Sequence, residues 1–274
     1  MRFGFSGNLV ARENDPLGLW TVEKLVQFGY DFIELPICEV LRLDQKDYLA
    51  LKKRISDAGI GVDVCNMFFG PEMRLTGPKV DDAAVEAHYR RVMETARDLG
   101  IQTIVFGSPG AKSYPEGFPY EKAYAQLVAL HKKIDKAAGE YGLRVVIEPV
   151  RSPECNLIVN FKEGCRLAEE VGGANTGVLV DYYHMTWEGE TPEVVAELGK
   201  KWLQHVHFAA PYIPGQGERN VPLDFDEWPY SRFTDALKAI GYDQTVTIEA
   251  YTRDFESHAP KALALMKKHF AQVH

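Results

Sequence analysis

Residues 120–149 read YEKAYAQLVALHKKIDKAAGEYGLRVVIEP and contain one complete repeat of the fold. Apolar residues three and four positions apart predict a helix over Tyr120–Tyr141. Gly142 follows directly, and a glycine after a helix adopts the left-handed conformation that ends it. The apolar run Arg144–Pro149 then predicts a buried strand, which carries the carboxylate of Glu148 at its end. The stretch is therefore one helix–strand step of a parallel α/β fold.

The same alternation of strand and helix recurs eight times along the chain. Strands are predicted at Arg2–Gly7, Tyr30–Pro36, Gly61–Phe68, Thr103–Ser108, Arg144–Pro149, Gly177–Tyr182, Gln204–Phe208 and Thr245–Ala250. Helices are predicted at Leu17–Phe28, Lys46–Ala58, Asp82–Leu99, Tyr120–Tyr141, Lys162–Val171, Pro192–Leu198, Ser231–Ile240 and Pro260–Phe270. Five glycines separate a helix from the next strand: Gly29, Gly59, Gly100, Gly142 and Gly241. They predict the short turns at the amino-terminal face of a barrel.

The loops after the strands are longer and richer in proline, glycine and aromatic residues. They lie at Phe69–Pro78, Pro109–Pro119, Arg151–Asn160 and Pro211–Pro229. An open doubly wound sheet uses the same units, but no GxGxxG turn follows the first strand. A chain of 274 residues suits a closed barrel, which has about 250. We therefore expect an α/β fold, a single (β/α)8 TIM barrel domain over residues 1–274, with its site at the carboxyl ends of the strands.

Four consecutive strands carry a ligand-type side chain at the end that faces this site. Glu148, Asp181 and Glu249 each finish an apolar run, and alternation points His205 and His207 to one face, with His207 nearer the mouth. The spacings of 33, 26 and 42 residues match one βα unit apiece. One such carboxylate is equally compatible with a salt bridge or a helix cap. Four on successive strands favour a shared cation.

A divalent metal ion would resolve the repulsion among three converging carboxylates, which otherwise raise one another's pKa. Three oxygen ligands and one imidazole suit Mn²⁺, Mg²⁺ or Co²⁺ better than structural zinc, which prefers thiolates and histidines. The expected cofactor is therefore one divalent ion, Mn²⁺ first, with Mg²⁺ or Co²⁺ as the alternatives.

The chain resembles the xylose isomerase-like barrels, a family of sugar isomerases and epimerases, and within it the D-tagatose and D-psicose 3-epimerase group. The resemblance covers the whole chain and lies in the segments Phe3–Asn8, Gly29–Leu35, Ile147–Pro149, Asp181–His184, His205–His207 and Ile248–Glu249. The DxxH and HxH elements on adjacent strands are its most specific parts.

The resemblance implies a role for each of several residues. The metal ligands would be Glu148, Asp181, His207 and Glu249. Glu148 and Glu249 would also be catalytic, exchanging protons with the substrate, while Glu154 and His184 would bind the sugar.

One departure from the 3-epimerases concerns an arginine that they carry six residues after the metal-binding histidine. This chain has Ile213 there and Arg219 further along. Arg219 is therefore either a substrate-binding residue reaching in from a longer loop or a surface residue. Glu34, at the end of the second strand, either touches substrate or forms a structural ion pair, and His205 is expected to be hydrogen-bonded in the interior.

The resulting hypothesis is a metal-dependent epimerase or isomerase that interconverts ketoses, or related keto-polyols, by proton transfer through a metal-stabilised enediolate. An inosose dehydratase-like lyase on the same metal site is the alternative. The barrel also resembles endonuclease IV, which needs extra histidines where this chain has Asn66 and Ser108. A barrel that binds a sugar without turnover is a further alternative.

Composition narrows the partners. The formal net charge of -8 disfavours nucleic acid and suits a small sugar substrate. No apolar run approaches the roughly 20 residues that span a bilayer, and the amino terminus lacks a signal-peptide pattern, so a cytoplasmic location without membrane contact is expected. The four cysteines show no CxxC spacing and are expected to be reduced. The family resemblance implies a homo-oligomer, a dimer or tetramer.

Overall fold

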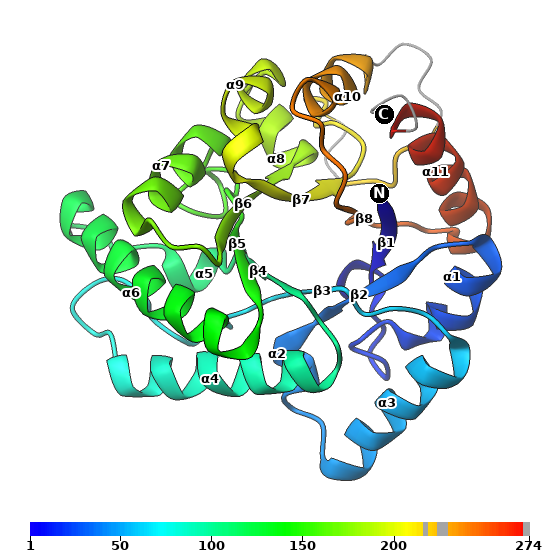
Figure 1. The fold of residues 1–274 in the computed structure, drawn as a ribbon, viewed down its shortest axis with the longest axis horizontal. Helices are drawn as coiled ribbons and strands as arrows, with labels where there is room; N and C mark the ends of the chain where they lie inside the picture. Colours follow the sequence, from blue (N-terminus) through cyan, green and yellow to red (C-terminus); the bar gives the residue numbers. More distant parts are fainter. Residues whose placement is uncertain (216–218, 224–229, 271–274) are drawn as a thin grey trace.

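The computed structural model describes residues 1–215, 219–223 and 230–270. Eight parallel strands close into a barrel in sequence order, and β8 pairs with β1. The long helices form a ring around it (Figure 1). The strands are β1 Arg2–Ser6, β2 Phe32–Pro36, β3 Val64–Asn66, β4 Thr103–Phe106, β5 Arg144–Ile147, β6 Thr176–Asp181, β7 Leu203–Phe208 and β8 Thr245–Ile248. The predicted closed (β/α)8 barrel is confirmed, and the open sheet is wrong.

Each predicted helix is present, and the short 3-10 turns Asn8–Val10 and Leu19–Thr21 lie near the start of the chain. The α-helices are α1 Val22–Phe28, α2 Ile37–Val40, α3 Gln45–Ala58, α4 Asp82–Asp98, α5 Pro109–Lys112, α6 Tyr120–Tyr141, α7 Phe161–Val171, α8 Tyr182–Trp187, α9 Glu193–Trp202, α10 Tyr230–Ala239 and α11 Phe255–Phe270. The sequence did not predict α2, α5 and α8, which are short helices that follow β2, β4 and β6. Part of the predicted loop Pro211–Pro229, at 216–218 and 224–229, lies outside the described residues.

Glycines end several of the helices, and an aspartate cap sets the start of the last one. The five glycines predicted to stop helices all have positive φ: Gly29, Gly59, Gly100, Gly142 and Gly241. The last helix begins at Phe255, five residues before the predicted start at Pro260. Its first turn is held by Asp254, whose carboxylate accepts a hydrogen bond from the main-chain N–H of Ser257 at 3.1 Å. Pro260 therefore lies inside the helix rather than at its first position.

The barrel interior is stacked in layers, and this stacking positions the site. A buried apolar cluster fills the lower interior: Phe32, Val64, Val105, Val146 and Leu179. Side chains two residues apart on a strand share a face. Two residues beyond these five, the chain reads Glu34, Asn66, Gly107, Glu148 and Asp181. The polar groups at the mouth are therefore carried directly above an apolar plug, on the same interior face.

Two further predictions can be compared with the described residues. All four cysteines are free and buried: Cys38, Cys65, Cys155 and Cys165. The reduced state predicted from their spacing is thus confirmed. None of the helices in the described part of the chain is long and apolar enough to cross a membrane.

Candidate metal centre and substrate cavity

The four predicted ligand residues meet at the mouth of the barrel. Glu148 directly follows β5, Asp181 ends β6, His207 lies near the end of β7, and Glu249 directly follows β8. One ligand atom from each lies within 4.8 Å of the others, and all four residues are buried. We call this group the acidic cluster. Strands 26 to 42 residues apart in sequence converge on it because the closed sheet brings their carboxyl ends together.

The imidazole of His207 is at the centre of the acidic cluster. Its Nδ1 lies 2.9 Å from a carboxylate oxygen of Glu148, 2.9 Å from one of Glu249 and 3.7 Å from one of Asp181. Its Nε2 lies 3.0 Å from Glu34 Oε1. Because an ionised carboxylate only accepts hydrogen bonds, Nε2 carries the hydrogen toward Glu34. Without a metal ion, a second hydrogen on Nδ1 would donate to the facing carboxylates. In neutral His207 the Nδ1 lone pair would instead face a cation held between them.

Glu34 supports this arrangement from the opposite side of the barrel. The second oxygen of its carboxylate lies 3.3 Å from Nε2 of His205, whose Nδ1 lies 2.7 Å from Thr245 Oγ1. Glu34 and both histidines are fully buried. Of the two roles predicted for Glu34, the structural one agrees with its hydrogen bonds to His205 and His207, and the interior hydrogen bonding predicted for His205 is confirmed. The substrate contact suggested for Glu34 is wrong, because His205 and His207 cover its carboxylate.

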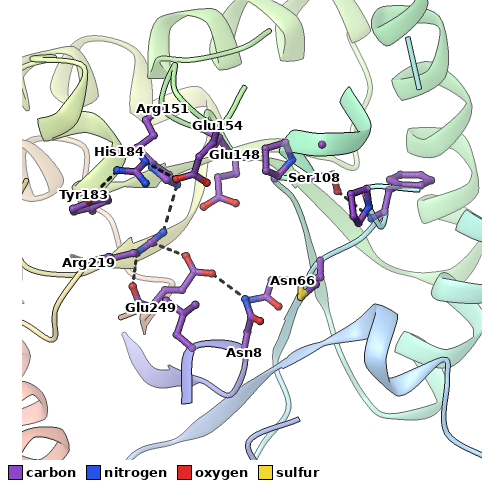
Figure 2. A pocket seen from close by; sticks show the side chains of 18 of the residues that line it. Asn8, Asn66, Ser108, Glu148, Arg151, Glu154, Tyr183, His184, Arg219 and Glu249 are labelled. Atoms are coloured by element: carbon purple, nitrogen blue, oxygen red, sulfur yellow. Dashed lines mark hydrogen bonds and ion pairs between the residues drawn. The ribbon is translucent and has the colours of Figure 1, made fainter. Parts of the chain in front are cut away.

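Arg219 enters the acidic cluster from the loop after β7. Its guanidinium forms ion pairs with Asp181 and Glu249, and its Nη1 lies 3.4 Å from Nε2 of His184. Figure 2 shows it between His184 and Glu249, joined to both by dashed lines. Its side chain is only 11% exposed, so the surface position considered from sequence is wrong. Three carboxylates and one guanidinium leave two negative charges when His207 is neutral.

Burial and these charges set the acidities in the acidic cluster. Burial raises the pKa of Glu148 to about 7. Burial also opposes ionisation of Asp181 and Glu249, but the positive groups around them, Arg219 first, hold the pKa of each carboxyl below its usual range. Burial disfavours the charged form of His207 as well, yet the surrounding carboxylates raise its pKa well above the ordinary value. In the absence of a metal ion, protons therefore take the place that a cation would fill.

A cavity of about 460 Å³ opens beside the acidic cluster at the barrel mouth. Its wall includes both predicted catalytic residues and all three predicted substrate-binding residues: Glu148, Glu249, Glu154, His184 and Arg219. Aromatic and apolar groups complete it, among them Leu9, Met67, Phe69, Tyr183 and Tyr251. Polar groups converging in a largely apolar cleft of this size are typical of a small-molecule site.

His184 is positioned through Asp181. One oxygen of Asp181 accepts the main-chain N–H of His184 at 3.0 Å and so caps α8, while the other faces the acidic cluster. Burial lowers the pKa of His184 to about 4, so the ring is neutral at pH 7. With Nε2 facing Arg219, its buried Nδ1 has no hydrogen-bond partner among the described residues. A ligand in the cavity could supply one.

Glu154 lies on the outer wall of the cavity, in the loop after β5. Its carboxylate pairs with Arg151, whose guanidinium also donates to the Tyr183 hydroxyl at 3.0 Å and lies 4.4 Å from the ring centroid of Trp187. This group is more exposed than the acidic cluster, and Glu154 keeps 38% of its side chain accessible. The geometry leaves Glu154 in reach of a bound molecule while fixing its direction.

Sequence reasoning missed Lys112 and Gly107 and considered Asn66 only as a minor substrate contact. Lys112, at the end of α5, is fully buried and donates from Nζ to the main-chain oxygen of Glu148 at 2.7 Å. Asn66 donates from Nδ2 to Glu249 Oε1 at 3.3 Å. At Gly107 a Cβ would lie 2.2 Å from Glu148 Oε2, so only glycine leaves enough space for the carboxylate of Glu148. A period-two pattern above the apolar plug would have pointed to Asn66 and Gly107, but no sequence signal marks Lys112.

The residues present fit a divalent ion. Three carboxylates and one imidazole nitrogen are a donor set that hard or borderline cations accept, and a carboxylate orients the ligand histidine from behind, as is usual in metal sites. The excess of two negative charges matches the charge of such an ion. Glu34, His205 and His207 also lie close enough to share a cation, but the hydrogen bonds among them already occupy the facing atoms.

The curated proteins to which the chain is similar include ketose 3-epimerases. It is 25% identical over 240 residues to the D-psicose 3-epimerase of Agrobacterium fabrum, covering 85% of this chain and 78% of that protein. It is 24% identical over 259 residues to the ketose 3-epimerase of Arthrobacter globiformis, covering 92% and 84%. Both relatives are isomerase-class enzymes by name.

Solved structures agree on the fold. A D-psicose 3-epimerase crystallised in the presence of D-fructose superposes with a TM-score of 0.83 at 20% identity, covering 98% of this chain and 99% of the other. An IOLI protein with a bound zinc atom superposes with a TM-score of 0.73 at 19% identity, covering 100% and 98%. The sequence model of the xylose isomerase-like TIM barrel matches residues 22–269, nine-tenths of the chain, and the chain therefore belongs to that family.

Proposed function

We propose that this protein is a metal-dependent sugar epimerase or isomerase that interconverts ketoses or related keto-polyols. One observation carries the proposal: two glutamates of the acidic cluster, Glu148 and Glu249, both line the cavity in which a small molecule would lie. The ketose 3-epimerase names of its relatives support the same reaction class. We propose one divalent ion as cofactor, Mn²⁺ first, with Mg²⁺ or Co²⁺ as alternatives, because oxygen donors dominate the ligand set.

The proposed ligands are Glu148, Asp181, His207 and Glu249. When bound, the ion would stabilise the negative charge that develops on the substrate's carbonyl oxygen in an enediolate. Glu34 holds His207 in the tautomer that presents Nδ1, and Asp181 is fixed by its cap on α8. The chain thus holds its donors in place before any substrate arrives, which lowers the cost of reorganisation during the reaction.

We assign the proton transfers to Glu148 and Glu249. They come from β5 and β8, with two other strands between them, and both reach the cavity wall. One carboxylate takes the proton from the carbon beside the carbonyl, and the other returns a proton to the opposite face. Inversion at that carbon needs two such groups, whereas an aldose–ketose isomerase needs only one. Two glutamates on different sides of one cavity therefore favour epimerisation.

Substrate binding falls to three groups. Nδ1–H of His184 lacks a partner in the described structure and would donate to a substrate oxygen. Arg219 would donate to oxygens near the reacting carbons, since its guanidinium lies beside Glu249. Glu154 would accept a hydrogen bond from a hydroxyl further from the acidic cluster. The proposed substrate is a small sugar.

We also propose that the protein forms a homodimer or homotetramer, which its molar mass in solution would test.

The test is proton exchange in D₂O. The metal-loaded protein, incubated with D-psicose, D-fructose and D-tagatose, should incorporate deuterium at the carbon beside the carbonyl and form the epimer. The Glu148→Gln variant, which keeps the size of the side chain, is the matched control and should incorporate none above background. Loss of water from the substrate would instead indicate the lyase. Absence of exchange with all three sugars in the presence of Mn²⁺, Mg²⁺ or Co²⁺ would overturn the proposal.

A further inference from the structure

Outside the acidic cluster itself, Asn66 is the one uncharged side chain of the described residues that hydrogen-bonds one of its carboxylates. It ends β3, is 3% exposed and lines the cavity. Its Nδ2 donates to Glu249 Oε1 at 3.3 Å and to Ser6 Oγ at 3.1 Å. Figure 2 marks the first bond with a dashed line. The amide of Asn66 therefore touches the proposed proton-transfer group.

These bonds fix the orientation of the amide. An ionised carboxylate can only accept, so the NH₂ group of Asn66 must face Glu249 and a flipped amide would place two acceptors together. The carbonyl oxygen, Oδ1, is then directed away from Glu249. It is buried and has no hydrogen-bond partner among the described residues. A buried acceptor without a partner is unfavourable, and a donor on a bound molecule would satisfy it.

The backbone beside Asn66 supports a role in binding. Met67, the next residue, has φ 53°, and Ser108 has φ 41°. Among the described non-glycine residues only Ile158 also has a positive φ. Met67 and Ser108 both line the cavity, and Ser108 Oγ accepts the main-chain N–H of Phe69 at 3.0 Å. Left-handed backbone at non-glycine residues is costly and clusters at ligand sites. The residues with this costly backbone, which follow β3 and β4, therefore lie at the cavity wall.

We propose that Asn66 determines substrate specificity by accepting a hydrogen bond from a substrate hydroxyl with Oδ1, while its Nδ2 positions Glu249. This inference rests on the proposed function, because it places a polyhydroxylated substrate in the cavity. Oδ1 and Nδ2 belong to one amide, so the hydroxyl that Oδ1 binds lies on the reacting carbon or beside it. The preferred substrate class is therefore a sugar that keeps a free hydroxyl next to the epimerised centre.

A binding cycle tests the inference without relying on turnover. Calorimetry with the Mn²⁺-loaded protein compares a ketohexose with its series of mono-deoxy analogues, for the wild type and for Asn66→Leu. In the wild type, removal of one particular hydroxyl near the carbonyl should weaken binding about 10- to 100-fold. In Asn66→Leu the same removal should change binding less than about threefold, because both partners of the bond are then absent.

Two further variants separate the roles of Asn66. Asn8→Leu is the matched control, since Asn8 lines the same cavity without a hydrogen bond to the acidic cluster in the described structure, and it should keep the wild-type response at the Asn66-dependent position. Asn66→Asp keeps an acceptor but loses the donor to Glu249. It should therefore retain the sensitivity to the deoxy analogue while its kcat for deuterium exchange falls about tenfold or more, with KM changed less.

The outcomes are distinct. An unchanged deoxy profile in Asn66→Leu, with exchange intact in the wild type, overturns this inference and leaves the proposed function standing. A wild type that neither binds nor exchanges any ketohexose overturns the proposed function and this inference with it. If Asn66→Leu does not fold, as judged by its melting curve, a wild type insensitive to every deoxy position still overturns the inference.

Discussion

The two halves of the barrel rim differ in what they contribute to the site. β5–β8 carry the acidic cluster, which is three carboxylates and one imidazole. β1–β4 carry, at the matching positions, Ser6, Glu34, Asn66 and Gly107. Each of the last three serves one member of the other half: Glu34 holds His207, Asn66 holds Glu249, and Gly107 leaves room for Glu148.

The metal ligands and the groups that support them come from different halves of the barrel. The ligand half, β5–β8, concentrates negative charge that a cation can neutralise. The supporting half, β1–β4, adds one carboxylate, Glu34, which already pairs with two histidines. A fourth free carboxylate facing the acidic cluster would add repulsion without a partner. We therefore expect substitutions in the ligand half to abolish metal binding or chemistry, and those in the supporting half to weaken them by graded amounts.

The largest effect is expected for Glu148→Gln. The amide keeps the shape of the side chain but cannot take up a proton at neutral pH and is a weaker ligand. Deuterium exchange into a ketose should fall about 10³-fold or more. Glu39→Gln is the control, because Glu39 belongs to α2 and pairs with Arg42 instead. Exchange within tenfold of the wild type would contradict a proton-transfer role for Glu148.

The next largest effect is expected for Arg219→Met. Loss of the guanidinium removes a charged donor to the substrate, so KM should rise about 10- to 100-fold. It also leaves Asp181 and Glu249 without their ion pairs in the metal-free protein. Metal-free protein should therefore melt at a lower temperature than the wild type, and Mn²⁺ should raise its melting temperature by more. A surface residue would change neither KM nor the shift.

Glu34→Gln should weaken metal binding about 10- to 100-fold, because the carboxylate behind a ligand histidine fixes its tautomer and raises its basicity. Glu34 is fully buried and lies outside the cavity wall, so KM for the sugar at saturating metal should change little. Titration with Mn²⁺, followed by calorimetry, measures the affinity. Wild-type affinity in this variant would show that the two barrel halves are not coupled.

Metal binding and pH should be linked through the raised pKa values of Glu148 and His207. Without metal, both groups hold protons in the folded protein at pH values where the unfolded chain has released them. The folded state without metal should therefore lose stability as pH rises from about 5 to about 8. Mn²⁺ must displace those protons, so its affinity should rise about tenfold per pH unit for each proton released. Calorimetry in buffers of different ionisation enthalpy counts the protons, and a count of zero at pH 7 would contradict the account.

The smallest effect is expected for Gly107→Ala. The added Cβ would lie 2.2 Å from Glu148 Oε2, which is closer than van der Waals contact. The carboxylate of Glu148 must therefore shift to make room. Metal affinity should fall roughly threefold to tenfold, less than the loss expected for Glu34→Gln. Gly177→Ala is the control, because a Cβ there, near the start of β6 and four residues before Asp181, would meet the side chain of Gln204 instead of a metal ligand. Equal effects of the two alanines would show that the loss is general strain.

The ligand half could be predicted from sequence because each of its strands is an apolar run that ends in a charged or imidazole side chain. The supporting half could not. Asn66 and Glu249 are 183 residues apart, and nothing local shows that they meet. Glu34 was recognised as facing the mouth, but only the closed barrel reveals that His205 and His207 cover it.

The loops were the least predictable part. Arg219 was left between the substrate site and the surface, because the length of a loop does not say where its side chains point. Lys112 gave no signal at all, since a lysine in a loop is usually solvated, whereas here its ammonium is buried against the main-chain oxygen of Glu148. Strand and helix order followed from periodicity, which depends on local spacing alone.

Anomalous diffraction from crystals soaked in Mn²⁺ shows whether the acidic cluster binds one ion. We expect one strong peak at the barrel mouth, about 2.0–2.4 Å from Glu148, Asp181, His207 Nδ1 and Glu249, with the guanidinium of Arg219 moved away from Asp181. A cluster without a peak at saturating Mn²⁺, with Arg219 still bonded to Asp181 and Glu249, would contradict this expectation.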